Sequence, residues 1–293
     1  MVRARLTVVL ALLAVTAGCG TPALERASTS TEDVTPAPLP EGTPEAVVPG
    51  VTTAGVADAT VLKEAHVAAL RGGNFTVHHA REEWYANGSL RARTRLVARF
   101  PGDGRYLIER TFEGPVHARI GTGGTVRQYG DANGTVRLRV AADGTVLSRS
   151  TASAPGGRVP RTSLVTDPYS GRTVLLVLRG VDVDTVRPVE GRAAYRLRGS
   201  GVADRAALTS LLSPTLTVGV RNVSVDATVG ETGLVERLRF AYTVTLRGEP
   251  VQITRTIRFT EVGTTTLDRP AWARAETATV TQATGVRSTT VPS

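Results

Sequence analysis

Hydrophobic residues recur with a helical period near residue 60 and with a period of two from residue 75 onward. Between residues 58 and 70 the apolar side chains fall on one stripe at 3.6-residue spacing. Asp58 or Thr60 can cap the first turn, and Gly72-Gly73 follows the last. This segment is therefore predicted to be an amphipathic helix that precedes a long series of strands.

The alternation that follows predicts antiparallel strands with one buried face and one solvent face. Residues 75–85, 90–100 and 105–112 form the first three, joined by turns at Asn87-Gly88 and Gly102-Asp103-Gly104. Gly-Thr-Val units then begin at residues 124, 134 and 144 and indicate a meander that turns every ten residues. We therefore expect about six consecutive strands.

The middle of the chain is less regular. The apolar run from Val174 to Leu178 fits a buried strand or a short helix, and the flanking Asp167-Pro168 and Arg179-Gly180 favour the helix. Residues 192–198 alternate again, and residues 204–212 are expected to form another short helix. Three long strands are predicted after that segment, at residues 216–229, 234–246 and 251–259.

A run of strands with a few segregated helices predicts an α+β protein with one large antiparallel sheet. A sheet of this size curls, and its apolar concave face has to be covered. We expect two or three short helices to form that cover. The folded domain is expected to span residues 58–272, and residues 273–293 are expected to be a flexible tail.

The N-terminus has the pattern of a secretory signal peptide at residues 1–18. Arg3 and Arg5 precede an apolar run of about ten residues, which is too short to span a membrane that needs roughly 20. Thr16-Ala17-Gly18 then precedes Cys19, the only cysteine of the chain, and this ending resembles a lipobox. Lipidation of Cys19 is therefore the preferred interpretation, and an ordinary signal peptide that ends near a free cysteine is the alternative.

Residues 19–57 are rich in proline, threonine, serine and alanine and lack apolar periodicity. Such a segment is expected to be a disordered tether. Together with a lipid on Cys19, it predicts a domain anchored to the outer face of the cytoplasmic membrane, at the cell surface. The membrane is then one expected partner, and the chain itself is expected to be a monomer.

All four asparagines lie in Asn-x-Ser/Thr sequons, at Asn74, Asn87, Asn133 and Asn222. This distribution favours a glycoprotein that is exposed to an N-glycosylating exterior. Asn-Gly followed by serine or threonine is also a hairpin turn, which by itself accounts for Asn87 and Asn133. The two interpretations are compatible, because hairpin tips are accessible.

The net charge of +9 is carried almost wholly by arginine, since Lys63 is the sole lysine. Arginine suits phosphate and carboxylate, so an anionic envelope surface is a reasonable partner. The alternative is that arginines such as Arg91, Arg93 and Arg95 only solvate the exposed face of a strand. Nucleic acid is not expected as a partner, because aromatic residues make up only 4% of the chain and the protein is expected to be exported from the cell.

Motifs for catalysis or metal binding are weak. His78 and His79 are adjacent, so on a strand they point to opposite faces, and each histidine is expected to be structural. Gly121-Thr122-Gly123-Gly124 lacks the lysine and the helix of a phosphate-binding loop. No nucleophile elbow occurs. The sequence therefore favours a protein that is not an enzyme and needs no cofactor or metal.

The order of elements resembles the LolA-like lipoprotein-carrier superfamily, which includes the mycobacterial LprG and LppX lipoproteins. The resemblance covers about residues 58–272 and rests on element order, on the helix of residues 62–70 leading into Asn74-Phe75-Thr76-Val77, and on the strand at residues 191–197. The chain looks closest to cell-surface lipoproteins of unknown function from halophilic archaea. This resemblance implies an eleven-stranded half-barrel that wraps helices over an apolar cavity.

Two functions of different classes fit these observations. The first is binding or carriage of a lipid or acyl chain between sheet and helices, and the second is a non-enzymatic surface structural or interaction module with a solid core. In the first case an apolar cavity is expected to be bordered by strand residues and by the helix above them. These positions are Val61, Leu62, Ala65, Leu96, Ala98, Phe240, Tyr242, Val244, Ile253 and Ile257.

Overall fold

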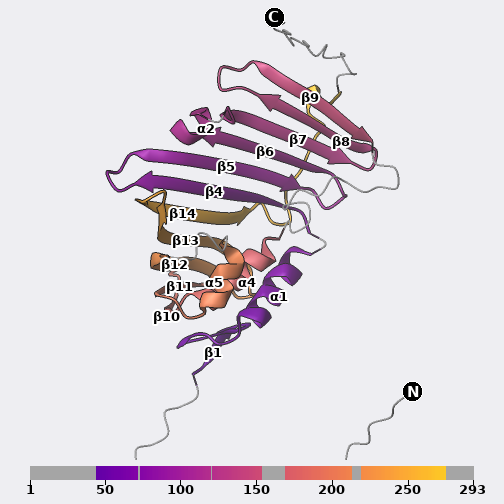
Figure 1. Cartoon of the computed structure of the whole chain (residues 1–293). Coiled ribbons are helices and arrows are strands. Elements are labelled where there is room, and N and C mark those ends of the chain that lie inside the picture. Colours follow the sequence, from indigo (N-terminus) through magenta and orange to yellow (C-terminus); the bar gives the residue numbers. More distant parts are fainter. Residues whose placement is uncertain (1–43, 72, 120, 154–168, 213–218, 275–293) are drawn as a thin grey trace, which may run out of the picture. The chain divides into compact units, whose positions relative to one another are not determined.

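Eleven antiparallel strands of the computed structural model form one curved, open sheet (Figure 1). The structure describes residues 44–71, 73–119, 121–153, 169–212 and 219–274. In spatial order the strands are β10 (Val183–Pro188), β11 (Ala194–Ser200), β12 (Arg221–Gly230), β13 (Val235–Leu246), β14 (Glu249–Thr260), β4 (Phe75–Tyr85), β5 (Leu90–Phe100), β6 (Tyr106–Glu113), β7 (Gly124–Asp131), β8 (Gly134–Val140) and β9 (Val146–Ser153).

The topology joins two meanders through one long-range pairing. Strands β4 to β9 form the first meander and β10 to β14 the second, and β14 pairs with β4 from Thr260–Thr76 to Val251–Tyr85. The last strand of the described residues, β14, therefore lies beside β4, the first strand of the large sheet. This arrangement confirms the predicted α+β class with a large, curved antiparallel sheet and a six-strand meander.

Three helices cover one face of the sheet at its β10 to β14 end (Figure 1): α1 (Ala59–Leu70), α4 (Gly171–Gly180) and α5 (Arg205–Leu211). All three were predicted, including the helix at the apolar run after Asp167-Pro168. We call the face that they cover the inner face and the opposite one the outer face. Two short helices, α2 (Pro115–Arg119) and α7 (Ala271–Arg274), were not predicted.

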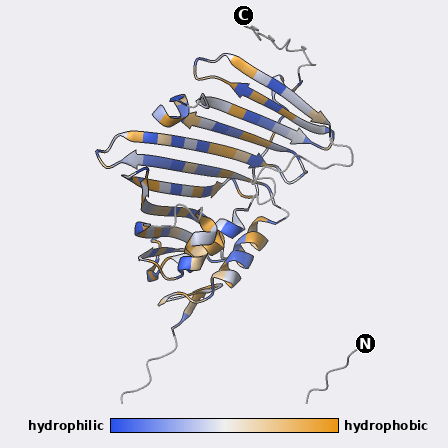
Figure 2. Cartoon of the chain, in the orientation of Figure 1, coloured by the Kyte–Doolittle hydropathy of each residue, from blue (hydrophilic) through white to orange (hydrophobic). Residues whose placement is uncertain are grey.

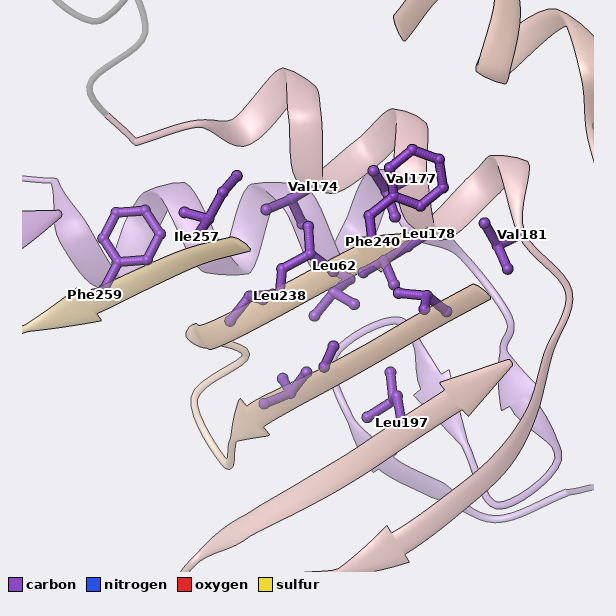
Figure 3. Close-up of a cluster of buried hydrophobic side chains, with 14 of the residues drawn as sticks. Leu62, Val174, Val177, Leu178, Val181, Leu197, Leu238, Phe240, Ile257 and Phe259 are labelled. Atoms are coloured by element: carbon purple, nitrogen blue, oxygen red, sulfur yellow. The ribbon is translucent and has the colours of Figure 1, made fainter. Parts of the chain in front are cut away.

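The core lies between these helices and the inner face. Strand positions two residues apart, such as Leu238 and Phe240 on β13 and Ile257 and Phe259 on β14, are buried against Leu62 of α1 and against α4 (Figure 3). The alternation of hydropathy along the strands follows the same pattern (Figure 2). At roughly 25 cal/mol per Å² of buried apolar surface, this contact is the main stabilising term of the helical cover.

Buried His66 connects α1 to two other parts of the chain. The backbone N–H of Val235 donates to its Nδ1 (3.2 Å), so its Nε2 carries the proton and donates to the carbonyl of Tyr169 (2.8 Å). The buried histidine thereby gives the backbone N–H of Val235 and the backbone carbonyl of Tyr169 their hydrogen-bond partners in the core. The buried stripe of α1 is Leu62, His66 and Leu70. The sequence predicted a stripe of Leu62 with valine and alanine instead, because a histidine does not stand out as a buried residue in a hydrophobic pattern. Asp58 is the N-cap, and its carboxylate accepts from Thr60 N and Val61 N.

The predicted tether ends earlier than residue 57. Three short strands, β1 (Ala46–Val48), β2 (Val51–Thr52) and β3 (Gly55–Val56), form a small sheet, and Val48 and Val51 are buried in the main core. Gly50 has φ +78°, and a Cβ there would lie 2.3 Å from the carbonyl oxygen of Asp58. Pro49-Gly50 therefore makes the tight turn that brings these valines onto α1. The rest of the predicted tether, residues 19–43, lies outside the described residues, as do Cys19 and the segment predicted to be a signal peptide.

Two further boundaries differ from the predictions. Strand β12 begins at Arg221, five residues after the expected start at Leu216, and positions 216–218 lie outside the described residues. At the C-terminal end, Leu267 and Ala273 pack with Leu107, Tyr129 and Val136 on the outer face. The folded part thus continues through residue 274, because this segment covers an apolar patch of β6 to β8; residues 275–293 lie outside the described residues.

Candidate functional site: an arginine-lined groove on the inner face

An open groove of about 960 Å³ lies on the inner face where the helical cover ends. It lies between α1 and α4 on one side and strands β14, β4, β5 and β6 on the other. Its apolar lining consists of Val67, Leu96, Tyr169, Leu175 and Ile257, and its cationic lining consists of Lys63, Arg71, Arg81, Arg110, Arg172 and Arg255. None of the described residues that line the groove is acidic. The groove therefore combines an apolar floor with a concentration of positive charge.

Strand periodicity places both kinds of side chain on the same face. On β14, Ile253, Arg255 and Ile257 are two residues apart and share the inner face, while Arg258 is exposed on the outer face. Arg255 pairs in register with Arg81 of β4, and Leu96 of β5 pairs with Arg110 of β6. Arg255 and Arg81 thus lie on adjacent strands, and Arg110 lies two strands from Arg81, on the far side of Leu96.

The helical side of the groove depends on a close contact between α1 and α4. A Cβ on Gly171 would lie 2.8 Å from Cγ2 of Val67, so a glycine at the start of α4 permits this approach. Ser170 precedes it with φ +54°, and its hydroxyl lies 3.0 Å from Nε2 of His79 on β4. The N-terminal end of α4 is thereby held to both α1 and the sheet, at the rim of the groove.

Arg255 and Arg110 are held in surroundings that disfavour their charge. Burial lowers the pKa of the Arg255 guanidinium, and the nearby Arg81 lowers that pKa further. Tyr242 raises the pKa of Arg255, but not enough to offset burial. The guanidinium carbon of Arg255 lies 5.8 Å from the centroid of the Tyr242 ring. Burial also lowers the pKa of Arg110, with a further contribution from Arg137. Within the described ranges, Arg110 has no carboxylate partner.

Arg81, which also lines the groove, has a carboxylate partner. Its Nη2 lies 2.8 Å from Oε1 of Glu83, and Arg91 pairs with the other oxygen of the same carboxylate. Glu83 is buried on the inner face, and a β-bulge after it places Arg91 within reach. The prediction that Arg91 only solvates the outer face is therefore corrected: the bulge interrupts the alternation at that residue.

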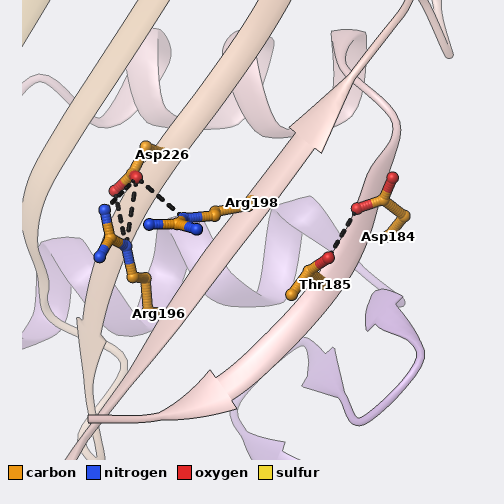
Figure 4. Close-up of polar contacts among 5 residues, drawn as sticks. All are labelled: Asp184, Thr185, Arg196, Arg198 and Asp226. Carbon is orange, nitrogen blue, oxygen red and sulfur yellow. Dashed lines mark hydrogen bonds and ion pairs between the residues drawn. The ribbon is translucent and has the colours of Figure 1, made fainter.

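On the outer face, several arginines pair with carboxylates. Asp226 accepts from both Arg196 and Arg198, with N–O distances down to 2.5 Å (Figure 4). Burial raises the pKa of Asp226, but the hydrogen bonds and charges of the two arginines outweigh burial and leave that pKa below its ordinary value. The ion pairs of Arg93 and Arg95 with Glu113 follow the same pattern. Several outer-face arginines thus have carboxylate partners, whereas no carboxylate pairs with Arg110 or Arg255 within 4.0 Å among the described residues.

The ten residues predicted to border a cavity fall into three groups. Leu96 and Ile257 line the groove. The following belong to the solid core cluster beneath the helices: Leu62, Ala98, Phe240, Tyr242, Val244 and Ile253. Val61 is 43% exposed and Ala65 is half-buried against Gly233, so the structure corrects the expectation that these two cover an apolar space.

Sequence reasoning missed the groove arginines, although a signal was present. Arg255 occupies an apolar-face position between Ile253 and Ile257, and Arg110 occupies one between Ile108 and Phe112. Strand positions whose side chains face the core normally carry apolar residues. An arginine at such a position therefore places a charge within a hydrophobic pattern. Its local environment could not be inferred, because the partner strands β4 and β14 are far apart in the sequence.

The sequons occupy different environments. Asn87 and Asn133 are exposed at hairpin tips, and Asn222 is exposed on β12. Asn74 is half-buried, and its side-chain oxygen accepts from the backbone N–H of Thr265. Their glycosylation stays a prediction. In the described part of the chain, no helix is long and apolar enough to cross a membrane, and no group of three or more His, Cys, Asp or Glu side chains is arranged to hold a metal ion.

No protein-family model matches this chain, and no curated protein matches it. Solved structures with similarity to it include a LolA superfamily protein from Nitrosomonas europaea, at 10% identity and a TM-score of 0.25, over 75% of this chain and 98% of that one. A DUF1329 family protein from Desulfovibrio piger matches at 11% identity and a TM-score of 0.26, over 73% of this chain and 95% of that one. Scores of this size carry no argument about function, and the closer resemblance to halophile surface lipoproteins stays a prediction.

Proposed function

We propose that this chain is an exported, lipid-anchored binding protein that holds the apolar part of an amphiphile in the inner-face groove. The observation that carries the proposal is the open groove itself, which has the buried side chains of Leu96 and Ile257 at its floor and the half-buried Leu175 of α4 at its side. A volume of about 960 Å³ lies within the size range of small-molecule sites, which are mostly apolar with a few placed polar groups. An acyl chain laid on this floor gains free energy as its surface leaves water.

Anchoring belongs to the same proposal. Lipidated Cys19 would keep the domain on the outer face of the cytoplasmic membrane, and the tether would let the groove reach lipid or acylated molecules nearby. The groove offers shape and charge for binding, so we propose a binding role and not an enzymatic one.

A second candidate function is supported by the density of the main core. Phe240, Tyr242, Val244 and Ile253 are each at most 1% exposed, so the space beneath the helices is filled by the protein itself. A surface interaction module with a solid core would have this interior. The two candidates differ in the groove, which only the binding function requires.

Replacing Leu175 by tryptophan is expected to weaken amphiphile binding about tenfold. Leu175 is a half-buried residue of α4 at the groove, and an indole there would cover part of the floor. Loss of about 60 Å² of apolar contact at roughly 25 cal/mol per Å² corresponds to that factor. The measurement is a fluorescence titration with an anthroyloxy-labelled fatty acid.

The matched control is Leu176→Trp, on the same helix and similarly half-buried but outside the groove lining. It should bind the labelled fatty acid as the wild type does. If the wild type binds no fatty acid, the solid-core module replaces the binding function. If both variants lose affinity equally, the ligand does not lie in this groove.

A further inference from the structure

Two groove arginines face each other across the β14–β4 ladder. Arg255 and Arg81 are partners in register on the inner face. Like charges directly opposite each other on a sheet are destabilising. Glu83 offsets the charge of Arg81 on one side, at 2.8 Å, but no acid lines the groove among the described residues. Two guanidinium groups therefore face each other beside one buried carboxylate, that of Glu83.

Polar hydrogens in this region also lack acceptors. The Nε atoms of Arg81 and Arg255 are buried and have no hydrogen-bond partner among the described residues. Buried polar groups in folded proteins are nearly always hydrogen-bonded, so such a cluster calls for an explanation. An anion with several acceptor oxygens, bound in the groove, would accept from the arginines and offset their charge.

The apolar floor adjoins this cationic cluster. Ile257 is two residues from Arg255 on the same face of β14, and Leu96 is the register partner of Arg110. A ligand that places an anion among the arginines therefore has its neighbouring atoms over Leu96 and Ile257. Leu96 lies on β5, between Arg110 of β6 and Arg81 of β4, so charge and apolar surface adjoin within the groove, as they do in an amphiphile.

We propose that the groove recognises amphiphiles with a phosphate-ester headgroup, which Arg81, Arg110 and Arg255 hold while the acyl chain lies on Leu96 and Ile257. This inference rests on the proposed function and names its substrate class. The planar guanidinium fork donates two parallel hydrogen bonds to phosphate, and hydrogen bonds to a charged group are roughly twice as strong as neutral ones.

The experiment compares three soluble probes with the same 14-carbon chain, each below its micellar concentration: a lysophosphatidic acid, a lysophosphatidylcholine and a monoacylglycerol. A fourth titration uses inorganic phosphate alone. The full-length protein is expected to bind the lysophosphatidic acid at least about tenfold more tightly than the monoacylglycerol, because the charged hydrogen bonds are absent from the latter. Phosphate alone is expected to bind far more weakly, because it lacks the chain.

Arg255→Gln is expected to remove about tenfold of the affinity for the lysophosphatidic acid and to leave the affinity for the monoacylglycerol unchanged. The matched control is Arg258→Gln, with the same charge change on the same strand but on the outer face. Arg110→Gln provides a second test at a less enclosed position, should Arg255→Gln fail to fold. A thermal melt of each variant accompanies the titrations.

Equal affinity for all three amphiphiles, with both glutamine variants unchanged, would overturn the headgroup assignment and leave the proposed function intact. Phosphate binding as tight as lysophosphatidic acid binding would also overturn it, because the apolar floor would then contribute nothing. Absence of binding by all three amphiphiles would instead remove the proposed function itself.

Discussion

The variant Ala98→Trp is expected to lose about 3 kcal/mol or more of its free energy of unfolding. Ala98 is fully buried on the inner face, between Val77 and Ile108 in the two flanking ladders. Overpacking a well-filled core typically costs about 1 to 3 kcal/mol, and an indole in place of a methyl group is at the large end of such changes. Chemical denaturation monitored by circular dichroism measures the loss.

The control for this variant is Ala86→Trp, in the exposed turn between β4 and β5. Its stability should stay within about 0.5 kcal/mol of the wild type, as for most surface substitutions. A stable Ala98→Trp protein would mean that space remains beneath the helical cover. The ligand site would then extend into the interior, where the hydrophobic pattern first suggested it.

Replacing Cys19 by serine is expected to move the protein from the membrane fraction to the medium. A thioether-linked lipid needs the cysteine sulfur, and each buried methylene group of that lipid contributes roughly 0.8 kcal/mol to membrane attachment. Removing every acyl chain therefore abolishes attachment and does not merely weaken it. Fractionation of cells that express the full-length chain, followed by immunoblotting, measures the distribution.

Thr16→Leu is the companion variant, since leucine is the usual residue three positions before a lipidated cysteine. It should leave the protein in the membrane fraction, and the mass of the mature N-terminal peptide should show the lipid on Cys19. Membrane association of Cys19→Ser equal to that of the wild type would contradict lipid anchoring.

Local patterns in the sequence were sufficient for most of the fold. The period-two alternation at residues 75–85 and 234–246 and the capped stripe after Asp58 correspond to β4, β13 and α1, because each element follows from neighbouring residues alone. The short sheet at residues 46–56 was missed, because its few valines show no extended period and are buried only through contact with α1 and the core.

The candidate site was less predictable than the fold. Leu96 and Ile257 were expected to border an apolar space and do line the groove. Tyr242 and Val244 were expected there as well, yet they fill the core, because a residue that lines a cavity and one that fills it have the same hydrophobic pattern. The pairing of Arg255 with Arg81 depends on strands more than 160 residues apart, as their numbers show, and no local pattern encodes that register.

The central claim is that an acyl chain lies in the inner-face groove, and photocrosslinking tests it most directly. A fatty acid with a diazirine in its chain would be bound to the folded domain, irradiated, and located by mass spectrometry of the peptides. We predict labelling of the segments that contain Leu96, Leu175 and Ile257, and loss of that labelling when unlabelled fatty acid competes. Labelling confined to the outer face, such as the segment that covers Leu107 and Tyr129, would contradict the account.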